Sequence, residues 1–175
     1  RTVFDDAKNR LASITKERDY FAADAETQSV ISTMSTILAM PKPYSRIGEL
    51  PELVQKVKTA YDGLLDMKRE EVAENIRQCM QDVHQLASEA RDAGTLLHQA
   101  DDHFVNKREA AKTATSLTEL DAMITQLLNY KDTICRRMEV MSASRQQEAQ
   151  KPTPAATAKP GTPAPKPPKI ITVRR

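Results

Sequence analysis

The sequence predicts an all-α fold: an elongated antiparallel helical bundle or coiled coil of three long helices, followed by a disordered proline-rich linker. Only 4 of the 175 residues are glycine and 4% are aromatic, whereas β-sandwiches and barrels need glycine-rich turns and aromatic or β-branched strands. Apolar residues recur at alternating spacings of three and four, which is the helical period. Most prolines fall after residue 150. We therefore divide the chain into a helical domain over 1–150, a flexible linker over 151–169 and the truncated start of a following domain over 170–175.

The first helix is expected over residues 2–40, where the sequence contains neither glycine nor proline. Its apolar stripe begins at Phe4 and shifts phase before Val30, which leaves open a kink or break near residues 23–27. Pro41 ends the helix, because proline lacks the backbone N–H group.

The second helix is expected to begin at Pro51, since proline is favoured in the first turn, and to reach about Lys112. Its apolar seam is regular over about four heptads, which is typical of a coiled coil. A continuous helix of this length would extend roughly 90 Å at ~1.5 Å per residue. Gly94 is unfavourable in a helix interior, so a bend there is also open. The seam consists of Val72, Ile76, Cys79, Val83, Leu86, Ala90, Ala93, Leu97, Ala100 and Phe104.

A third helix is expected from the capping box of Ser116 and Glu119, in which the serine hydroxyl accepts a hydrogen bond from the backbone N–H group three residues on. Lys131 is the only charged member of its seam. Either the seam opens there or the lysine stem covers apolar surface. The seam consists of Leu117, Leu120, Ile124, Leu127, Lys131, Ile134, Met138 and Met141.

The short connection at residues 113–115 predicts that the second and third helices form an antiparallel hairpin. The second helix is then a spine, with the first helix along its first half and the third along its second half. This arrangement places Phe4 near Ala87. It also separates Cys79 from Cys135 by ~20 Å, which is beyond disulfide reach.

The end of the chain differs in composition from the helical part. Residues 151–169 mix proline with alanine, threonine and lysine, which favours an extended polyproline II linker. Residues 170–173 have the β-branched content of a strand, and the chain begins with Arg1 rather than methionine. We therefore expect a fragment of a longer protein. No run approaches the ~18 apolar residues that span a bilayer, and two isolated cysteines fit a reducing compartment, so a cytoplasmic location is expected.

No catalytic, cofactor-binding or metal site is predicted from these residues. The four glycines lie far apart and form no phosphate-binding loop. The residues His98, Asp101, Asp102 and His103 contain the donor types of a divalent metal site. A solvated polar stripe is the more ordinary interpretation of that pattern.

The formal net charge of +2 averages two unlike parts. The tail over 151–175 has six basic and no acidic side chains, which leaves residues 1–150 with 20 basic and 24 acidic side chains and a net charge of −4. A polyanion such as DNA would therefore contact the tail, whereas the helices would contact a protein partner. Arg136 and Arg137 form the only basic pair in the helical part that is not mixed with acids. The basic residues of the tail are Lys151, Lys159, Lys166, Lys169, Arg174 and Arg175.

Three stretches resemble a known family: SRIGELPELVQKVK at residues 45–58, KREEV at 68–72 and LDAMITQLLNYKD at 120–132. They are similar to the C-terminal helical region of the large P-loop ATPase, BrxC/PglY, of bacteriophage-exclusion (BREX) systems. The resemblance covers most of residues 45–141. It implies an intracellular antiphage protein whose site for ATP and magnesium lies outside these residues. No site residue of the family falls on a position of this chain.

Three hypotheses for function follow. The first is a non-catalytic helical assembly arm of a larger ATPase, which binds other proteins of a BREX defence complex. The second is a self-associating coiled-coil spacer or scaffold in an unrelated multidomain protein. The third is an arm that contacts DNA through the basic tail.

Overall fold

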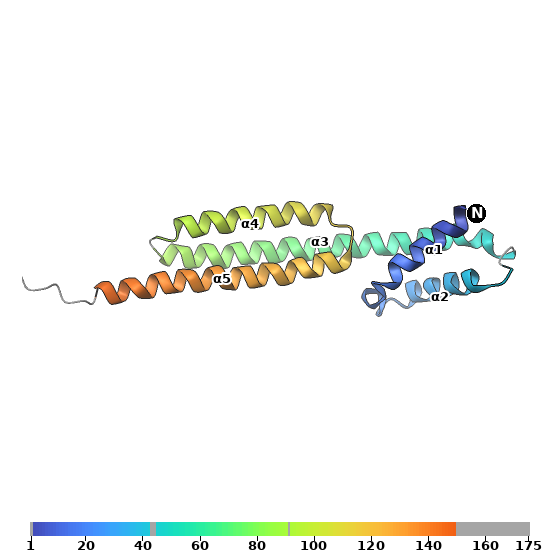
Figure 1. Ribbon diagram of the computed structural model, residues 1–175, viewed down its shortest axis with the longest axis horizontal. Helices are drawn as coiled ribbons and strands as arrows, with labels where there is room; N and C mark the ends of the chain where they lie inside the picture. Colours follow the sequence, from blue (N-terminus) through green and yellow to red (C-terminus); the bar gives the residue numbers. More distant parts are fainter. Residues whose placement is uncertain (1, 43–44, 91, 150–175) are drawn as a thin grey trace, which may run out of the picture.

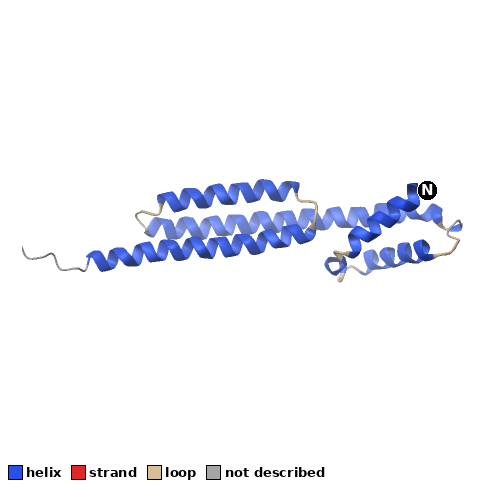
Figure 2. Cartoon of the chain, viewed as in Figure 1, coloured by secondary structure: helices blue, strands red, loops and turns tan. Residues whose placement is uncertain are grey.

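The computed structural model describes residues 2–42, 45–90 and 92–149, which form five α-helices and confirm the all-α class. Figure 2 shows that short loops join the helices and that the described part contains no strand. None of these helices is both long and apolar enough to cross a membrane. The linker and the following domain predicted after residue 150 lie outside the described residues. The elements are α1 (Thr2–Thr15), the 3-10 turn η1 (Arg18–Phe21), α2 (Ala25–Ala39), the 3-10 turn η3 (Ile47–Glu49), α3 (Leu50–Glu89), α4 (Gly94–Thr113) and α5 (Leu117–Ala149).

The 40-residue helix α3 is the spine of the molecule. It is about 60 Å long at ~1.5 Å per residue. Figure 1 shows α1 and α2 beside its first half, and α4 and α5 beside its second half. The predicted staggered arrangement along a central helix is therefore present. It is made of five helices rather than three, and α3 belongs to two successive three-helix bundles.

The single first helix expected over residues 2–40 is wrong. The chain leaves α1 after Thr15, turns through η1 and begins α2 after Asp24, whose carboxylate accepts a hydrogen bond from the Thr27 backbone N–H group at 3.0 Å. The break covers residues 16–24, so it begins earlier than the interval of residues 23–27 that the shift in apolar phase left open and overlaps it only at its end. Because α1 and α2 run antiparallel, α1 begins near the start of α3 and far from its end, where Ala87 lies (Figure 1).

The continuous second helix is also wrong. The chain ends α3 at Glu89 and begins α4 at Gly94, so the bend predicted at this glycine is a complete reversal. The Ala90 N–H group closes α3 by donating to the Ala87 carbonyl oxygen at 3.2 Å, and the buried Ala93 leaves room for the turn. The apolar seam continues through the reversal without a change of spacing because the residues on both sides face one core.

Helix α5 runs parallel to α3, and the predicted antiparallel hairpin is formed by α4 and α5 alone (Figure 1). Two ion pairs mark the parallel register: Lys68 Nζ lies 2.7 Å from Asp121 Oδ1, and Lys131 Nζ lies 3.3 Å from Asp82 Oδ2. The seam therefore does not open at Lys131. Its ammonium group crosses to a carboxylate on α3.

The seam of α5 forms the centre of the second bundle. The members that are buried in the structure are Leu117, Leu120, Leu127, Ile134 and Met138. On the facing side of α4, Phe104 is fully buried and its ring meets that of Tyr130 edge to face, with ring centres 5.8 Å apart. These seam residues, which could have paired with another chain, are therefore packed within this one.

Candidate functional site

The two bundles meet at a buried carboxylate, Glu17, in the turn between α1 and η1. This side chain is only 8% exposed. Its Oε1 atom accepts hydrogen bonds from the Ser116 hydroxyl at 2.6 Å and from the Thr118 backbone N–H group and hydroxyl, both at 2.9 Å. Its Oε2 atom accepts a hydrogen bond from the Tyr61 hydroxyl. Glu17 thus caps the N-terminus of α5 from a distant part of the chain, where a helix has unpaired N–H groups and a partial positive charge.

The electrostatics of this cluster favour an ionised Glu17. Burial alone would raise the pKa of its carboxyl, but hydrogen bonds from Ser116, Tyr61 and Thr118 outweigh burial and hold the pKa below its ordinary value. Burial and the hydrogen bond to Glu17 raise the pKa of Tyr61 to about 12. The phenol therefore stays protonated and donates to the carboxylate.

A second bridge lies beside the first. Asp121 of α5 accepts hydrogen bonds from the Tyr20 hydroxyl at 2.5 Å and from Lys68 Nζ on α3 at 2.7 Å. Arg69 of α3 donates to the Ala114 carbonyl oxygen, in the loop between α4 and α5, at 2.8 Å. These contacts and those of Glu17 tie η1, the middle of α3 and the start of α5 together. We call this cluster the joint.

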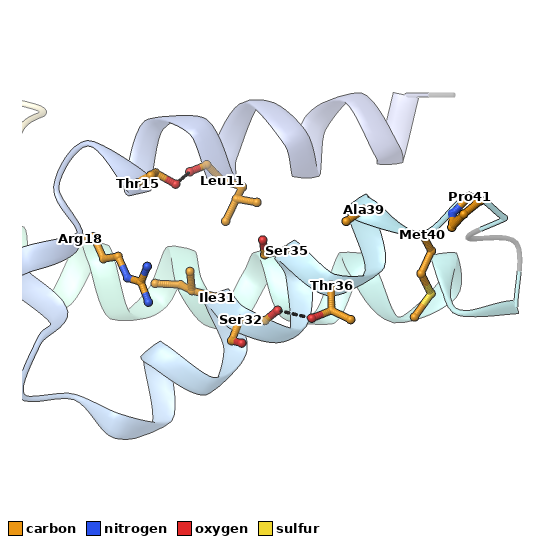
Figure 3. A pocket seen from close by; sticks show the side chains of 10 residues that line it. All are labelled: Leu11, Thr15, Arg18, Ile31, Ser32, Ser35, Thr36, Ala39, Met40 and Pro41. Carbon is orange, nitrogen blue, oxygen red and sulfur yellow. Dashed lines mark hydrogen bonds between the residues drawn. The ribbon is translucent and has the colours of Figure 1, made fainter.

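An open groove of about 660 Å³ lies between α1 and α2. Figure 3 shows Leu11 on α1 pointing towards α2, and Ser35 and Ala39 on α2 pointing towards α1. The Thr15 and Thr36 hydroxyls donate to carbonyl oxygens of their own helices. Arg18 at the groove donates to Gln28 Oε1 at 3.3 Å, and the residues that line the groove include no histidine, cysteine or carboxylate.

A second hollow, of about 480 Å³, lies at the other end of the molecule, between the start of α4 and the last turns of α5. Leu96 lines one side, and Val140 and Met141 line the other, with Arg136 and Arg137 at the edge. The lining is almost wholly apolar, and Val140 is 64% exposed. We call this surface the end hollow. It combines the basic pair noted in the sequence with Met141 at the end of the seam and with Leu96 and Val140, which lie outside the seams.

The structure does not bring the four candidate metal ligands together. Asp101 lies 2.8 Å from His84 Nε2, whereas His98 and Asp102 form a separate exposed pair at 3.6 Å. His103 stacks on Tyr130 with ring centres 3.8 Å apart, and burial and the charge of Lys107 lower the pKa of its imidazole. Within the described ranges, no group of three or more histidine, cysteine, aspartate or glutamate side chains could hold a metal ion.

The ~20 Å separation predicted for the cysteines is wrong, because α5 runs parallel to α3. The two ion pairs between α3 and α5 place Cys135 about three to seven residues further along the helix axes than Cys79, or ~5–10 Å. Both are free thiols; Cys79 is buried and Cys135 is half-buried. Burial raises the pKa of both thiols, so neither is activated as a nucleophile.

This burial predicts an order of thiol modification. In the folded protein, iodoacetamide at pH 8 should alkylate Cys135 slowly and leave Cys79 unmodified, because only the former reaches solvent. Mass spectrometry of peptides from the treated protein measures both adducts. In urea the two thiols should react at similar rates, and alkylation of Cys79 before Cys135 in the folded protein would contradict the packing of α3 against α5.

The basic tail lies outside the described residues. The joint was not predicted from the sequence, although a polar run beginning at Lys16 interrupts the apolar stripe of the first helix and could have marked a turn. Comparison of the sequence with protein-family models and with curated proteins, and of the structure with solved structures, finds no match.

Proposed function

We propose that this chain is a non-catalytic helical assembly arm of a larger ATPase and that it holds protein components at a fixed separation. The observation that carries this proposal is the continuity of α3 through both bundles, together with the joint at its middle. A single helix with packed partners along its whole length is stiff. The buried Glu17 fixes the angle between the two bundles by hydrogen bonds rather than by a flexible loop.

The resemblance to the BREX ATPase supports a bacterial antiphage complex as the setting. In that setting ATP and magnesium bind elsewhere in the longer protein, and this chain is an arm without enzymatic activity. The cytoplasm is the compartment that goes with this proposal.

The buried seam favours the arm over a self-associating spacer. The residues expected to form an intermolecular coiled coil, among them Phe104, Leu120 and Leu127, are already buried within the chain. Sedimentation velocity over a hundredfold range of concentration should therefore give a monomer at all concentrations. A dimer that increases with concentration would favour the spacer.

The test of the arm uses the longer protein that the proposal implies. Deleting residues 1–149 from it should leave the rate of ATP hydrolysis per molecule unchanged and abolish co-purification of the other components of the complex. Retained co-purification would contradict the proposal. A second variant, with all six basic residues of the tail changed to glutamine, tests the DNA alternative: it should assemble normally, and loss of salt-dependent DNA binding only in this variant would favour the DNA-contacting arm.

A further inference from the structure

The end hollow lies on the side of the α4–α5 pair that α3 does not cover. Its residues come only from α4 and α5, and the side chains on the opposite side of these helices are buried against α3. Leu96 and Met141 are each half-buried, and Val140, one helical turn after the two arginines, is 64% exposed. The second bundle therefore has a groove between two antiparallel helices, with an apolar floor.

The charge at this groove opposes that of the body. Residues 1–150 carry a net charge of −4, yet Arg136 and Arg137 stand together at the hollow, and neither forms an ion pair within the described part of the chain. Asp132, one turn before Arg136, lies 3.9 Å from Lys131 Nζ instead. Both guanidinium groups are thus available to carboxylates of a partner.

We propose that the end hollow is the docking site for an acidic amphipathic helix of another protein. A groove between two helices accepts a third helix, whose apolar side chains at spacings of three and four fill the hollow. Carboxylates on the flanks of that helix would pair with Arg136 and Arg137, whose planar guanidinium groups suit two-point contact with a carboxylate. The complementary charge sets the orientation of the helix and speeds the encounter.

Three other occupants of the end hollow are less well matched to its charge and its apolar floor. A symmetric contact with a second copy would place Arg136 and Arg137 of the two chains against each other. The apolar segment 170–173 of the chain itself is flanked by Lys169, Arg174 and Arg175 and would be repelled in the same way. DNA offers phosphates but nothing to fill the apolar floor.

This inference rests on the proposed assembly function and names the chemistry of its partner. The probe is a fluorescent synthetic peptide of about 18 residues, roughly five helical turns, with leucines at spacings of three and four and glutamates on the flanks. Fluorescence anisotropy with the full 175-residue chain should show saturable binding that weakens as salt rises. A peptide of the same composition with the leucines spread around the helix, and one with lysine in place of glutamate, should not bind.

Two variants test the location. Val140→Glu should weaken peptide binding by about tenfold or more, because it places a charged side chain on the apolar floor of the hollow. The double variant Arg136→Glu with Arg137→Glu should weaken binding by a similar factor, because it reverses the charge beside the hollow. Leu128→Glu is the matched control: Leu128 is an aliphatic residue of α5, 41% exposed and outside the end hollow, and its replacement should leave binding unchanged. Circular dichroism should show equal helix content in all variants.

Several results would overturn the proposal. The proposal is wrong if the amphipathic acidic peptide shows no saturable binding, or if the peptide with spread leucines binds equally well. It is also wrong if Leu128→Glu weakens peptide binding as much as Val140→Glu does. A dimer abolished by Val140→Glu would assign the hollow to a second copy, and tighter peptide binding after removal of residues 151–175 would assign it to the tail. If the peptide does not bind but the deletion of residues 1–149 still abolishes assembly, this inference fails and the assembly arm stands.

Discussion

Replacing Phe104 by alanine is expected to destabilise the protein by about 3–5 kcal/mol, because the substitution removes a large, fully buried aromatic ring and leaves a cavity. The ring lies edge to face with Tyr130 and fills the space between α4 and α5. Urea unfolding followed by circular dichroism at 222 nm measures the change in the free energy of unfolding.

The neighbouring Val105 provides the control for Phe104. It lies on the same helix but is 47% exposed, so Val105→Ala should change the free energy of unfolding by no more than about 0.5 kcal/mol. A loss below about 1 kcal/mol in Phe104→Ala, or equal losses in the two variants, would contradict the position of α4 in the second bundle.

Replacing Glu17 by glutamine is expected to destabilise the protein by about 2–3 kcal/mol at pH 7, because hydrogen bonds to a charged group contribute about 1.5–3 kcal/mol and the amide cannot accept at both of its terminal atoms. The amide nitrogen would face either the Tyr61 hydroxyl or the donors of Ser116 and Thr118. Urea unfolding again measures the loss. Tyrosine fluorescence adds a local reading, since Tyr61 lies in the joint.

The effect of Glu17 should also depend on pH. In the folded protein its pKa lies below the ordinary value of 4.5, so the folded state holds the proton less readily than the unfolded chain does. The ionised Glu17 carboxylate contributes its full stabilisation at pH values above the ordinary pKa. This stabilisation is lost as the pH falls through the lowered pKa of the folded state. The difference in the free energy of unfolding between the wild type and Glu17→Gln should therefore shrink on acidification.

Glu70 serves as the control for Glu17. It is an exposed carboxylate on α3, and Glu70→Gln should change the free energy of unfolding by no more than about 0.5 kcal/mol at any pH. A constant difference between Glu17→Gln and the wild type from pH 7 to pH 3 would show that the carboxylate charge does not stabilise the joint.

The helical period and the capping box in the sequence were sufficient to predict the all-α class, the buried seam of α5 and its start at Ser116, but not the division of the chain into five helices. Leu117, Leu120 and Leu127 are buried as expected, and Ser116 Oγ accepts the predicted hydrogen bond from the Glu119 backbone N–H group at 3.4 Å. These features depend on neighbours within one or two turns, which a single sequence contains.

The two chain reversals could not be predicted in the same way. An apolar seam with spacings of three and four is the same whether a helix continues or folds back, provided that both segments face one core. At Ala90 and Ala93 the reversal uses small residues that are also good helix formers. The turn at Glu17 has neither glycine nor proline and depends on partners about a hundred residues away.

The candidate surfaces show a similar division. The basic pair of Arg136 and Arg137 was visible in the sequence. The end hollow beside this pair could not be predicted, because it also needs Leu96, and only the chain reversal before α4 places Leu96 next to α5. The same reversal explains why the candidate metal ligands do not form one cluster. It packs α4 against α3, so that Asp101 pairs with His84 of α3.

The path of the chain also determines how the molecule would respond to tension. Helix α1 begins near one end of the long axis and α5 ends near the other, and α2, α3, α4 and α5 run close to that axis, whereas α1 is inclined to it (Figure 1). A pull applied between these points would load the helices in shear. Whole packed faces would then have to slide at once, instead of peeling apart turn by turn, and slow mechanical yielding under load is the expected behaviour.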